Sequence, residues 1–600
     1  MKRSKQKERG LHSVNRADKD VIPLLRVSRT AAVAVLALLT LLVYANSLAG
    51  KFVFDDTVIV QDNPSIQGLD AAHLKEIFGR HYWAAAETRG GLYRPVVMLS
   101  YAVNYAVGGS DPTGYHFVNL LLHALNGILV FLILEALFGR RALSFLTALL
   151  FILHPIRTEG VASIVGRTES LSACFALVSW YLYIRYRKGA GSLWLWIASV
   201  SFVLAALSKE SAFAFVALLP LTDYLFGDRK LRSGFMNRAA VVRYIPFGMG
   251  IAIALLLRYG ALGGLAPLYI NPRSNPLALA APWPRFLTAT NVFARYLGLL
   301  IWPVALSADY SFNQVPVVTS VVTWAAAVPL FLLVVIVVLL VWLRGSPVIL
   351  FSGFVFFSSF LLTSNWIQPI GTIMGERLMY FPALGFNCAT AFLLCQGFSR
   401  PKWRMLCTLA AGVLIAGYGL RTIGRNADWR NHYNLFHSAI ATSPESSLVQ
   451  SNYATVLLYE KNDIPGAIQH ARKALEIRPD DAADYFTLGQ ACHRAGDLAA
   501  AVEAFDSVIR LAPKTSGGAD ALREKAGIEE AMGRYMQARA SYEKLVQWRP
   551  ADVAASLALA RVYLKLGEVA LARDTLERCR RLAPNNRSVI EALQKFGTGR

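Results

Sequence analysis

Apolar runs separated by short polar or charged segments fill the first 421 residues of the chain. A helix needs about 17–25 mostly apolar residues to cross the hydrocarbon core of a membrane. The candidate runs cover residues 30–48, 115–138, 142–154, 168–185, 192–207, 211–226, 241–259, 285–302, 317–343, 348–362, 378–396 and 405–421. The pattern therefore predicts an all-α, polytopic membrane helix bundle.

Clusters of lysine and arginine between these runs predict how the bundle is oriented. They lie at the N-terminus and at 140–141, 185–188, 229–243, 344 and 400–404, and the positive-inside rule assigns them to the cytoplasm. This orientation requires an odd number of crossings. We interpret 285–302 as a re-entrant or surface helix, because Asn291 and Arg295 interrupt it, which leaves about eleven spans.

The C-terminal tail has a different pattern, because it is rich in alanine, polar and periodic. Its prolines recur every 34 to 37 residues, which is the period of tetratricopeptide helix pairs. Small residues such as Gly489 and Ala501 fall where paired helices approach closely. We expect about four repeats in an α-solenoid, whose concave face binds a peptide or docks on the membrane domain. The repeat prolines are Pro444, Pro479, Pro513, Pro550 and Pro584.

These patterns divide the chain into four parts. A basic cytoplasmic N-terminus covers 1–29, and the transmembrane domain covers 30–425 with its first outer loop at about 49–114. A linker at 426–445 precedes the repeat domain at 446–600. The first apolar run is expected to be a retained helix, since no small-residue cleavage site precedes a soluble domain.

Composition and charge support membrane insertion. Of the 600 residues, 55% are hydrophobic and 17% charged, which is too apolar for a soluble protein of this length. The net charge of +22 comes from short clusters between apolar runs, so membrane topology explains it better than a nucleic-acid partner. The six cysteines show neither metal-ligand spacing nor a disulfide framework.

Ionisable residues gather on the side of the bundle predicted to face away from the cytoplasm. Charges at the ends of membrane helices mark a substrate path unless they pair with one another or cap helices. The adjacent acids Asp55 and Asp56 follow the first span directly and are the first candidates for chemistry. The others are Arg94, His116, His154, Arg157, Glu159, Arg167, Glu169, Lys209, Glu210, Asp309, Glu376 and Arg377.

Acids and cations together at a membrane surface suit transfer of a sugar from a lipid phosphate. Arginine and lysine stabilise the departing phosphate, while a carboxylate takes the proton from an acceptor hydroxyl. In a single displacement, base and phosphate lie on opposite faces of the sugar, so the configuration inverts. A divalent cation held by the acidic pair is an option that the sequence does not require.

Several motifs resemble those of the transmembrane and tetratricopeptide-repeat proteins, which are O-mannosyltransferases of the C-type glycosyltransferase fold. The motifs are FVFDD, LYRPVV, GYHFVNLLLHAL, LFILHPIRTEGVASIVGRTES, LSKES, LSADYS and GERLMYFPALGF, followed by the repeat tail. The resemblance implies mannose transfer from a polyprenyl or dolichyl phosphate donor to serine or threonine hydroxyls. This chain has a shorter tail than animal members of the family, so we expect a bacterial relative.

The same resemblance implies that the acidic pair is catalytic, and the sequence does not choose between Asp55 and Asp56 as the general base. For the donor phosphate we expect Arg377 first and then Arg94, Arg167 or Lys209. His154, Glu159 and Glu376 are expected to support the site, and for His154 and Glu159 a helix-capping role is the alternative.

Two other functions are compatible with the sequence. The same enzyme could act on a lipid or an envelope glycan, or the chain could be a non-catalytic scaffold or transporter with a repeat adaptor. We see no inverted repeat that would favour transport. The expected location is the bacterial inner membrane with a periplasmic site, or the endoplasmic reticulum with a lumenal site. The expected partners are the donor lipid, membrane lipids and an acceptor protein bound by the repeats.

Overall fold

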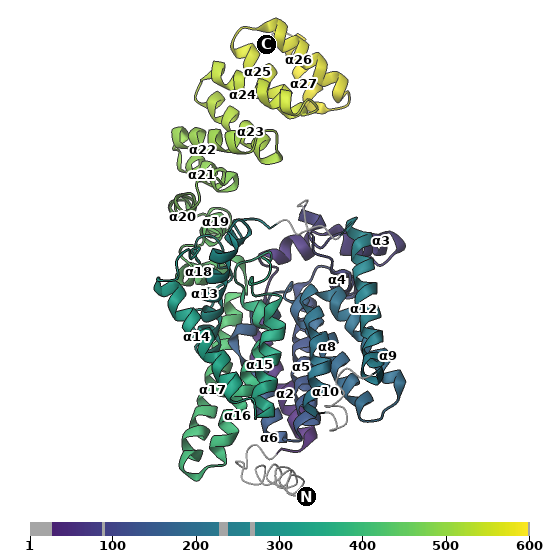
Figure 1. Ribbon diagram of the computed structural model, residues 1–600. Coiled ribbons are helices and arrows are strands. Elements are labelled where there is room, and N and C mark those ends of the chain that lie inside the picture. Colours follow the sequence, from purple (N-terminus) through teal and green to yellow (C-terminus); the bar gives the residue numbers. More distant parts are fainter. Residues whose placement is uncertain (1–26, 87–90, 227–237, 265–269, 598–600) are drawn as a thin grey trace, which may run out of the picture. The chain divides into compact units, whose positions relative to one another are not determined.

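The computed structural model describes residues 27–597 except 87–90, 227–237 and 265–269. All regular elements in this part of the chain are helices, and the chain divides into two compact units, Met1–Ser443 and Pro444–Arg600 (Figure 1). Most of the basic N-terminus predicted at 1–29, and much of the basic cluster at 229–243, lies outside the described residues.

The first unit is a bundle in which most of the long helices run between its two ends (Figure 1). Polar residues start several of them: Ser28 caps α2 by accepting a hydrogen bond from Ala31, and Asp111 caps α5 just before Pro112. The helices are α2 (Arg29–Tyr44), α3 (Ala71–Gly79), α4 (Pro95–Gly108), α5 (Pro112–Phe138), α6 (Arg141–Leu153), α7 (Glu159–Ala162), α8 (Arg167–Arg187), α9 (Ser192–Ser208), α10 (Leu218–Phe226), α12 (Arg238–Leu262), α13 (Pro282–Ile301), α14 (Trp324–Trp342), α15 (Pro347–Leu361), α16 (Ala383–Phe398), α17 (Pro401–Asp428) and α18 (His432–Thr442).

Helix α6 forms the centre of this bundle. Every residue from Ala142 to Leu153 is buried, and the helix packs against α2, α5, α16 and α17. A helix that is apolar on all sides must be surrounded by other helices or lipid, which explains why α6 is covered. The turn that follows α6 carries His154, Arg157 and Glu159, so the buried helix fixes the position of these polar groups.

Five helices in the described residues are long and apolar enough to cross a membrane, or six if α6 and the bent segment after it form one span. These five candidate spans are Arg29–Ala49, Pro112–Phe138, Val241–Leu262, Trp324–Trp342 and Pro401–Asp428. Other predicted spans correspond to the shorter apolar helices α9, α15 and α16. Several apolar helices therefore bear out a multi-pass membrane protein, while the count of eleven stays a prediction.

The segment predicted as a linker at 426–445 is largely helical and packs on the first unit. Helix α17 continues to Asp428, and α18 follows almost at once. The Asn426 side chain donates hydrogen bonds to the carbonyl of Val43, at 2.9 Å, and to Asn46, which ties α17 to the end of α2. These tertiary contacts are not visible in the local polarity that suggested a linker.

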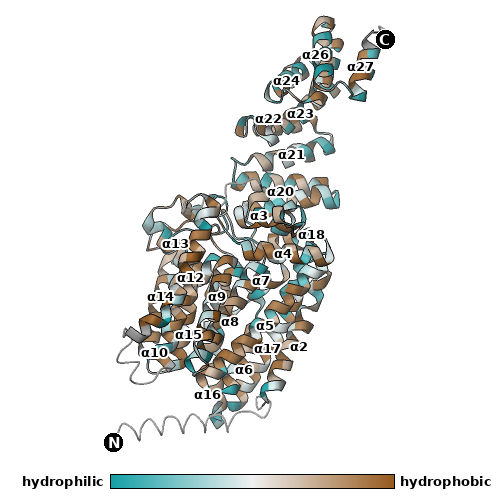
Figure 2. Cartoon of the chain, turned by 90° about the vertical axis from the view of Figure 1, so that its right-hand side faces the viewer, coloured by the Kyte–Doolittle hydropathy of each residue, from teal (hydrophilic) through white to brown (hydrophobic). Residues whose placement is uncertain are grey.

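The second unit is built from helix pairs, as the proline period predicts. The pairs are α19 (Ser447–Val456) with α20 (Ile464–Ile477), α21 (Ala482–Ala495) with α22 (Leu498–Leu511), α23 (Ser516–Ala531) with α24 (Tyr535–Trp548) and α25 (Val553–Lys565) with α26 (Val569–Leu582), followed by α27 (Arg587–Gly597). A Cβ atom on Gly489 would lie 2.8 Å from the ring of Phe505, so glycine permits the close approach of α21 and α22. Figure 2 shows more hydrophilic residues along these helices than along those of the first unit.

Candidate active site

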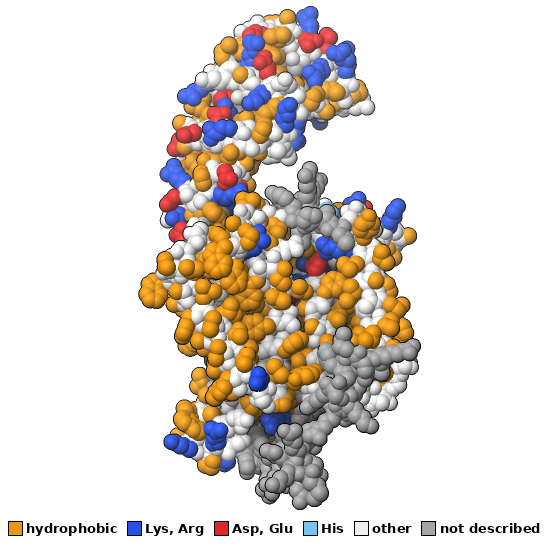
Figure 3. All heavy atoms as spheres, viewed as in Figure 1, with side chains coloured by type: hydrophobic (Ala, Val, Ile, Leu, Met, Phe, Trp, Pro, Cys, Tyr) orange, Lys and Arg blue, Asp and Glu red, His pale blue; other side chains and the backbone are white. Residues whose placement is uncertain are grey.

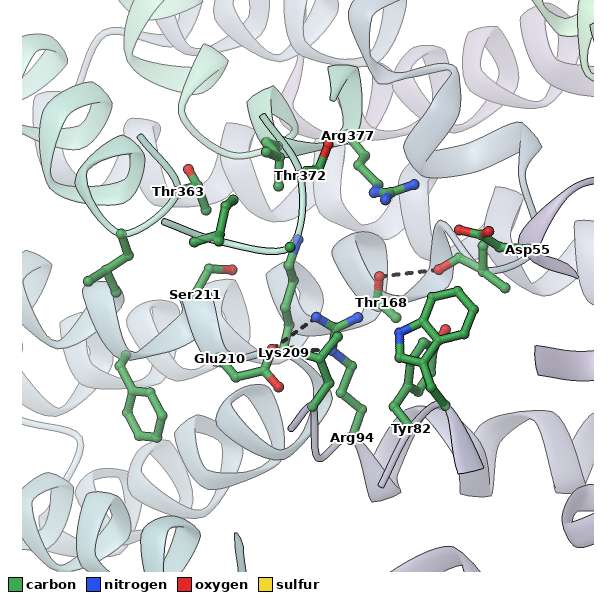
Figure 4. Close-up of a pocket in the computed structure, with 18 residues that line it drawn as sticks. Asp55, Tyr82, Arg94, Thr168, Lys209, Glu210, Ser211, Thr363, Thr372 and Arg377 are labelled. Carbon is green, nitrogen blue, oxygen red and sulfur yellow. Dashed lines mark hydrogen bonds and ion pairs between the residues drawn. The ribbon is translucent and has the colours of Figure 1, made fainter. Parts of the chain in front are cut away.

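A cavity of about 440 Å³ lies in the first unit, within the size range of small-molecule sites (Figure 4). Its walls come from six separate segments: the loop after α2, the segment before α4, the start of α8, and the segments that follow α9, α15 and residue 375. The lining residues are Asp55, Tyr82, Trp83, Leu92, Arg94, Val165, Thr168, Lys209, Glu210, Ser211, Phe213, Leu362, Thr363, Ile370, Gly371, Thr372, Arg377 and Leu378.

The two adjacent acids occupy different environments. Phe54, which precedes them, has a φ of 55°, in the left-handed region that non-glycine residues rarely adopt. The resulting turn leaves Asp55 half-buried in the cavity wall, whereas Asp56 is fully buried. A strained residue of this kind is often found next to a functional group that must be held in one orientation.

Asp56 is held by the backbone around it. Its carboxylate accepts hydrogen bonds from the backbone N–H of Val165 at 2.8 Å and of Val53 at 3.2 Å, and from the hydroxyl of Ser163 at 3.3 Å. These contacts join the first outer loop to the turn that precedes α8. Asp56 therefore holds two chain segments together, and Asp55 is the acid of the pair that lines the cavity.

Burial raises the pKa of both acids of the pair, and that of Asp56 to about 7. Burial raises the pKa of the Asp55 carboxyl group to about 6, and the nearby Glu159 and Asp309 carboxylates add to the shift, while Arg377 opposes it. A carboxylate with this pKa is ionised at pH 7 and is a stronger base than an exposed aspartate.

Arg377 lies beside Asp55 and is oriented by Glu159. The Glu159 carboxylate accepts one hydrogen bond from the Arg377 guanidinium at 2.7 Å and one from the Arg377 backbone N–H at 2.8 Å. Glu159 is only 2% exposed, while 29% of the Arg377 side chain remains accessible. Arg377 is thus fixed on one side and still open to the cavity on the other.

Two further cations line the cavity, and each is paired with an acid. Arg94 donates two hydrogen bonds to Glu210, at 3.0 and 3.2 Å, and Arg258 contacts the same carboxylate at 3.5 Å. Lys209 forms an ion pair with Glu169 on α8. These pairs balance part of the positive charge while keeping the cations in place.

The other predicted site residues lie away from the cavity wall. Arg167 is fully buried and donates to Asn119, Asn104, Ser100 and the carbonyl of Tyr115, so it joins α4, α5 and α8; its contact with a phosphate stays a prediction. A sequence cannot distinguish such an internal arginine from one that faces a cavity.

His154 and Glu376 also contact other groups of the protein and do not line the cavity. His154 caps the short helix Pro155–Arg157 by accepting a hydrogen bond from Ile156, and its other ring nitrogen contacts the carbonyl of Leu300. Glu376 is fully buried, accepts a hydrogen bond from Tyr310 at 2.9 Å and lies 3.5 Å from Arg425. Glu159 differs from both because it contacts a cavity residue directly.

Sequence reasoning missed the aromatic and apolar parts of the wall. Tyr82 and Trp83 line the cavity, and the Arg94 guanidinium lies over the Tyr82 ring, 5.0 Å from its centroid. The HYW sequence in the loop before LYRPVV was the available signal. Arg258, which contacts Glu210, lies inside an apolar run and gave no separate signal.

Within the described residues, no group of three or more His, Cys, Asp or Glu side chains is placed to hold a metal ion. The arrangement that does exist combines a carboxylate of raised pKa with three cations in the wall of one cavity. Such a cavity can deprotonate a hydroxyl and bind an anionic phosphate at the same time.

Comparisons with known proteins agree with the motifs. Residues 266–338 match the family described as "Protein O-mannosyl-transferase TMTC, DUF1736", and residues 435–515 and 530–595 match tetratricopeptide repeats. Protein O-mannosyl-transferase TMTC3 of Homo sapiens is 26% identical over 502 residues, which cover 79% of this chain and 54% of that protein. Protein O-mannosyl-transferase TMTC1 of Homo sapiens is 28% identical over 505 residues, covering 76% of this chain and 56% of that protein.

A nematode protein gives the same result. Protein O-mannosyl-transferase F38B6.6 of Caenorhabditis elegans is 26% identical over 430 residues, covering 70% of this chain and 59% of that protein. The chain thus spans a little more than half the length of these curated relatives. The resemblance indicated by the sequence motifs is confirmed: the chain is similar over most of its length to the TMTC protein O-mannosyl-transferases and carries tetratricopeptide repeats in its C-terminal region.

Proposed function

We propose that the protein is an integral-membrane glycosyltransferase that moves mannose from a polyprenyl or dolichyl phosphate to serine or threonine hydroxyls of proteins. The observation that carries the proposal is the composition of the cavity. Figure 4 shows Asp55 approaching from one side and Lys209 and Arg94 from the other. A base and a phosphate-binding wall on opposite sides of one cavity suit an in-line displacement at a sugar carbon.

In the proposed reaction, the Asp55 carboxylate accepts the proton of the acceptor hydroxyl. The hydroxyl oxygen forms a bond to the anomeric carbon of the sugar while the bond from that carbon to the phosphate oxygen breaks, so the configuration inverts. The lipid phosphate leaves with the bonding electron pair, and positively charged side chains stabilise it. No general acid is needed, because a phosphate is already a good leaving group.

Arg377 is the first candidate for contact with the phosphate. Its guanidinium is accessible, is oriented by Glu159 and belongs to the cavity wall. Arg94 and Lys209 would share the remaining charge. The apolar lining residues Leu92 and Phe213 offer a surface for the first part of the lipid carrier.

The chain leaves the first unit at the end of the bundle where the acidic pair lies. The backbone N–H of Lys51 donates to the carbonyl of Arg430, and the rings of Phe54 on the acidic loop and Phe436 on α18 pack edge to face at 5.7 Å. Helix α18, the last helix of the first unit, therefore lies at the same end of the bundle as the proposed active site. In a bacterium, positive-inside topology would make this the periplasmic side, and in a eukaryote the lumen of the endoplasmic reticulum. We propose that the repeats recruit the acceptor protein.

The test uses purified full-length protein, polyprenyl phosphate mannose and a Ser/Thr-containing peptide, with the peptide mass as readout. Asp55→Asn should lower the transfer rate by about 100-fold or more, because a general base typically contributes 10²–10⁴-fold. Asp56→Asn is the matched control for removing an adjacent charge, and it should retain more activity. An Asp55→Asn protein that folds and transfers mannose at the wild-type rate would overturn the assignment of the base.

A further inference from the structure

A second cavity, of about 550 Å³, lies at the other end of the first unit. It is formed where α2 and α6 begin and where α5 and α8 end. Its charged lining residues are Arg29, Glu135, Arg141, Arg185 and Lys188. The proposed transfer reaction makes no use of this cavity.

The charge in this second cavity is strongly positive, with four cations against one carboxylate. Glu135 is 15% exposed and accepts contacts from Arg29 at 3.1 Å and from Arg141 at 2.6 Å. The Lys188 ammonium donates to the carbonyl of Ala136, and Arg185 is exposed. One carboxylate shared by two arginines leaves the cavity with an excess of positive charge.

The helix dipole favours the positions of only two of these four cations. Arg185 and Lys188 lie at the C-terminal end of α8, where the helix dipole favours positive charge. Arg29 and Arg141 are the first residues of α2 and α6, where the dipole disfavours a cation and favours an anion. An anion in this cavity would therefore be stabilised by the side chains and by two helix N-terminal ends.

The second cavity lies where the candidate spans predict a membrane surface. The candidate span Arg29–Ala49 has 21 residues and leads from this cavity toward Asp55. At about 1.5 Å per residue it is roughly 31 Å long, close to the thickness of the hydrocarbon core. Trp196, near the start of α9, is 50% exposed, as expected for an aromatic residue at the lipid interface.

We propose that this cavity binds the phosphate of an anionic phospholipid in the leaflet opposite the proposed active site. A phosphodiester matches the excess positive charge, and basic pockets between helix ends are typical sites for anionic headgroups. Free phosphate offers the same charge, but the cavity lies at the membrane interface, where a lipid can also place its acyl chains against the apolar helices. The exposed Leu38 on α2 is one such apolar contact.

The test measures binding of phosphatidylglycerol to the full-length protein in nanodiscs of phosphatidylcholine, with soluble glycerol phosphate as a second probe. The double variant Arg185→Gln/Lys188→Gln removes two cavity cations that form no ion pair with a carboxylate of the described residues. Since each basic residue near an anionic surface contributes about 1 kcal/mol, or about fivefold, affinity should fall about 25-fold.

The matched control is Arg344→Gln/Lys402→Gln, which removes the same charge from exposed positions at the same end of the bundle but outside the cavity. Figure 3 shows Lys and Arg side chains at this lower end of the unit. The control should bind phosphatidylglycerol like the wild type. An equal loss in both double variants would overturn the site in favour of diffuse surface charge. Equally strong binding of glycerol phosphate would overturn the assignment to a lipid.

Discussion

Replacing Glu159 by glutamine tests whether this acid works through Arg377. Glutamine keeps the shape of the side chain and one acceptor oxygen, but it loses the charge and presents an amide N–H₂ group to one of the two Arg377 donors. The affected contacts are those at 2.7 Å to the guanidinium and 2.8 Å to the backbone N–H. The variant should leave Arg377 less well oriented toward a phosphate.

The size of the effect follows from these two contacts. A hydrogen bond to a charged group contributes about 1.5–3 kcal/mol, and Glu159 is almost completely buried, so water replaces it poorly. If this contact stabilises the transition state, its loss should lower the transfer rate by about 10- to 100-fold. Because the Glu159 carboxylate raises the pKa of Asp55, the acid limb of the pH profile should also move to lower pH.

The assay is a double-mutant cycle with Glu159→Gln, Arg377→Gln and the double variant, followed by peptide mannosylation and by thermal unfolding. If Glu159 acts by positioning Arg377, its replacement should cost little once Arg377 is gone. Asp223→Asn, which disturbs ion pairs with Arg187 and Arg243 away from the cavity, is the control for a general loss of stability. Fully additive losses, or a folded Glu159→Gln protein with wild-type transfer, would refute the reasoning.

Three further predictions test other parts of the structure. In Arg94→Gln the KM for the donor lipid should rise by a larger factor than the one by which kcat falls, because the variant removes one of three cavity cations proposed to bind the donor phosphate; an unchanged KM would exclude Arg94 from the phosphate site. Arg167→Gln should lower the free energy of unfolding by about 3 kcal/mol with little change in KM, since it leaves buried acceptors without their charged donor; wild-type stability in denaturant unfolding would contradict this. A chain ending at Ser443 should fold and mannosylate a short peptide but lose activity on a folded protein acceptor; equal loss on both would contradict recruitment by the repeats.

The periodic features of the chain were predictable from sequence because they repeat. The proline spacing predicted helix pairs, and the structure has such pairs from Ser447 to Leu582. The apolar runs predicted most helices of the first unit, including the fully buried α6. The number of spans was less predictable, because several of the apolar helices are shorter than the length needed to cross a membrane.

The candidate site was predicted as a set of residues but not as an arrangement. Asp55 and Asp56 are neighbours in sequence, and only the turn at Phe54 gives one of them a place in the cavity wall and the other a backbone-binding position. Arg167 and Arg377 both follow turns that contain glycine, yet the first has internal partners and the second lines the cavity. Such differences depend on long-range contacts that no local pattern contains.

The pH dependence of kcat/KM for mannose transfer tests the central claim most directly. Burial raises the pKa of Asp55 to about 6, and the base must be ionised to accept a proton, so activity should fall as pH drops through this value. Between about pH 7.5 and pH 5 the expected loss is about tenfold, and the residual activity of Asp55→Asn should lack this limb. An acid limb that stays unchanged in Asp55→Asn would contradict the role of Asp55 as the base.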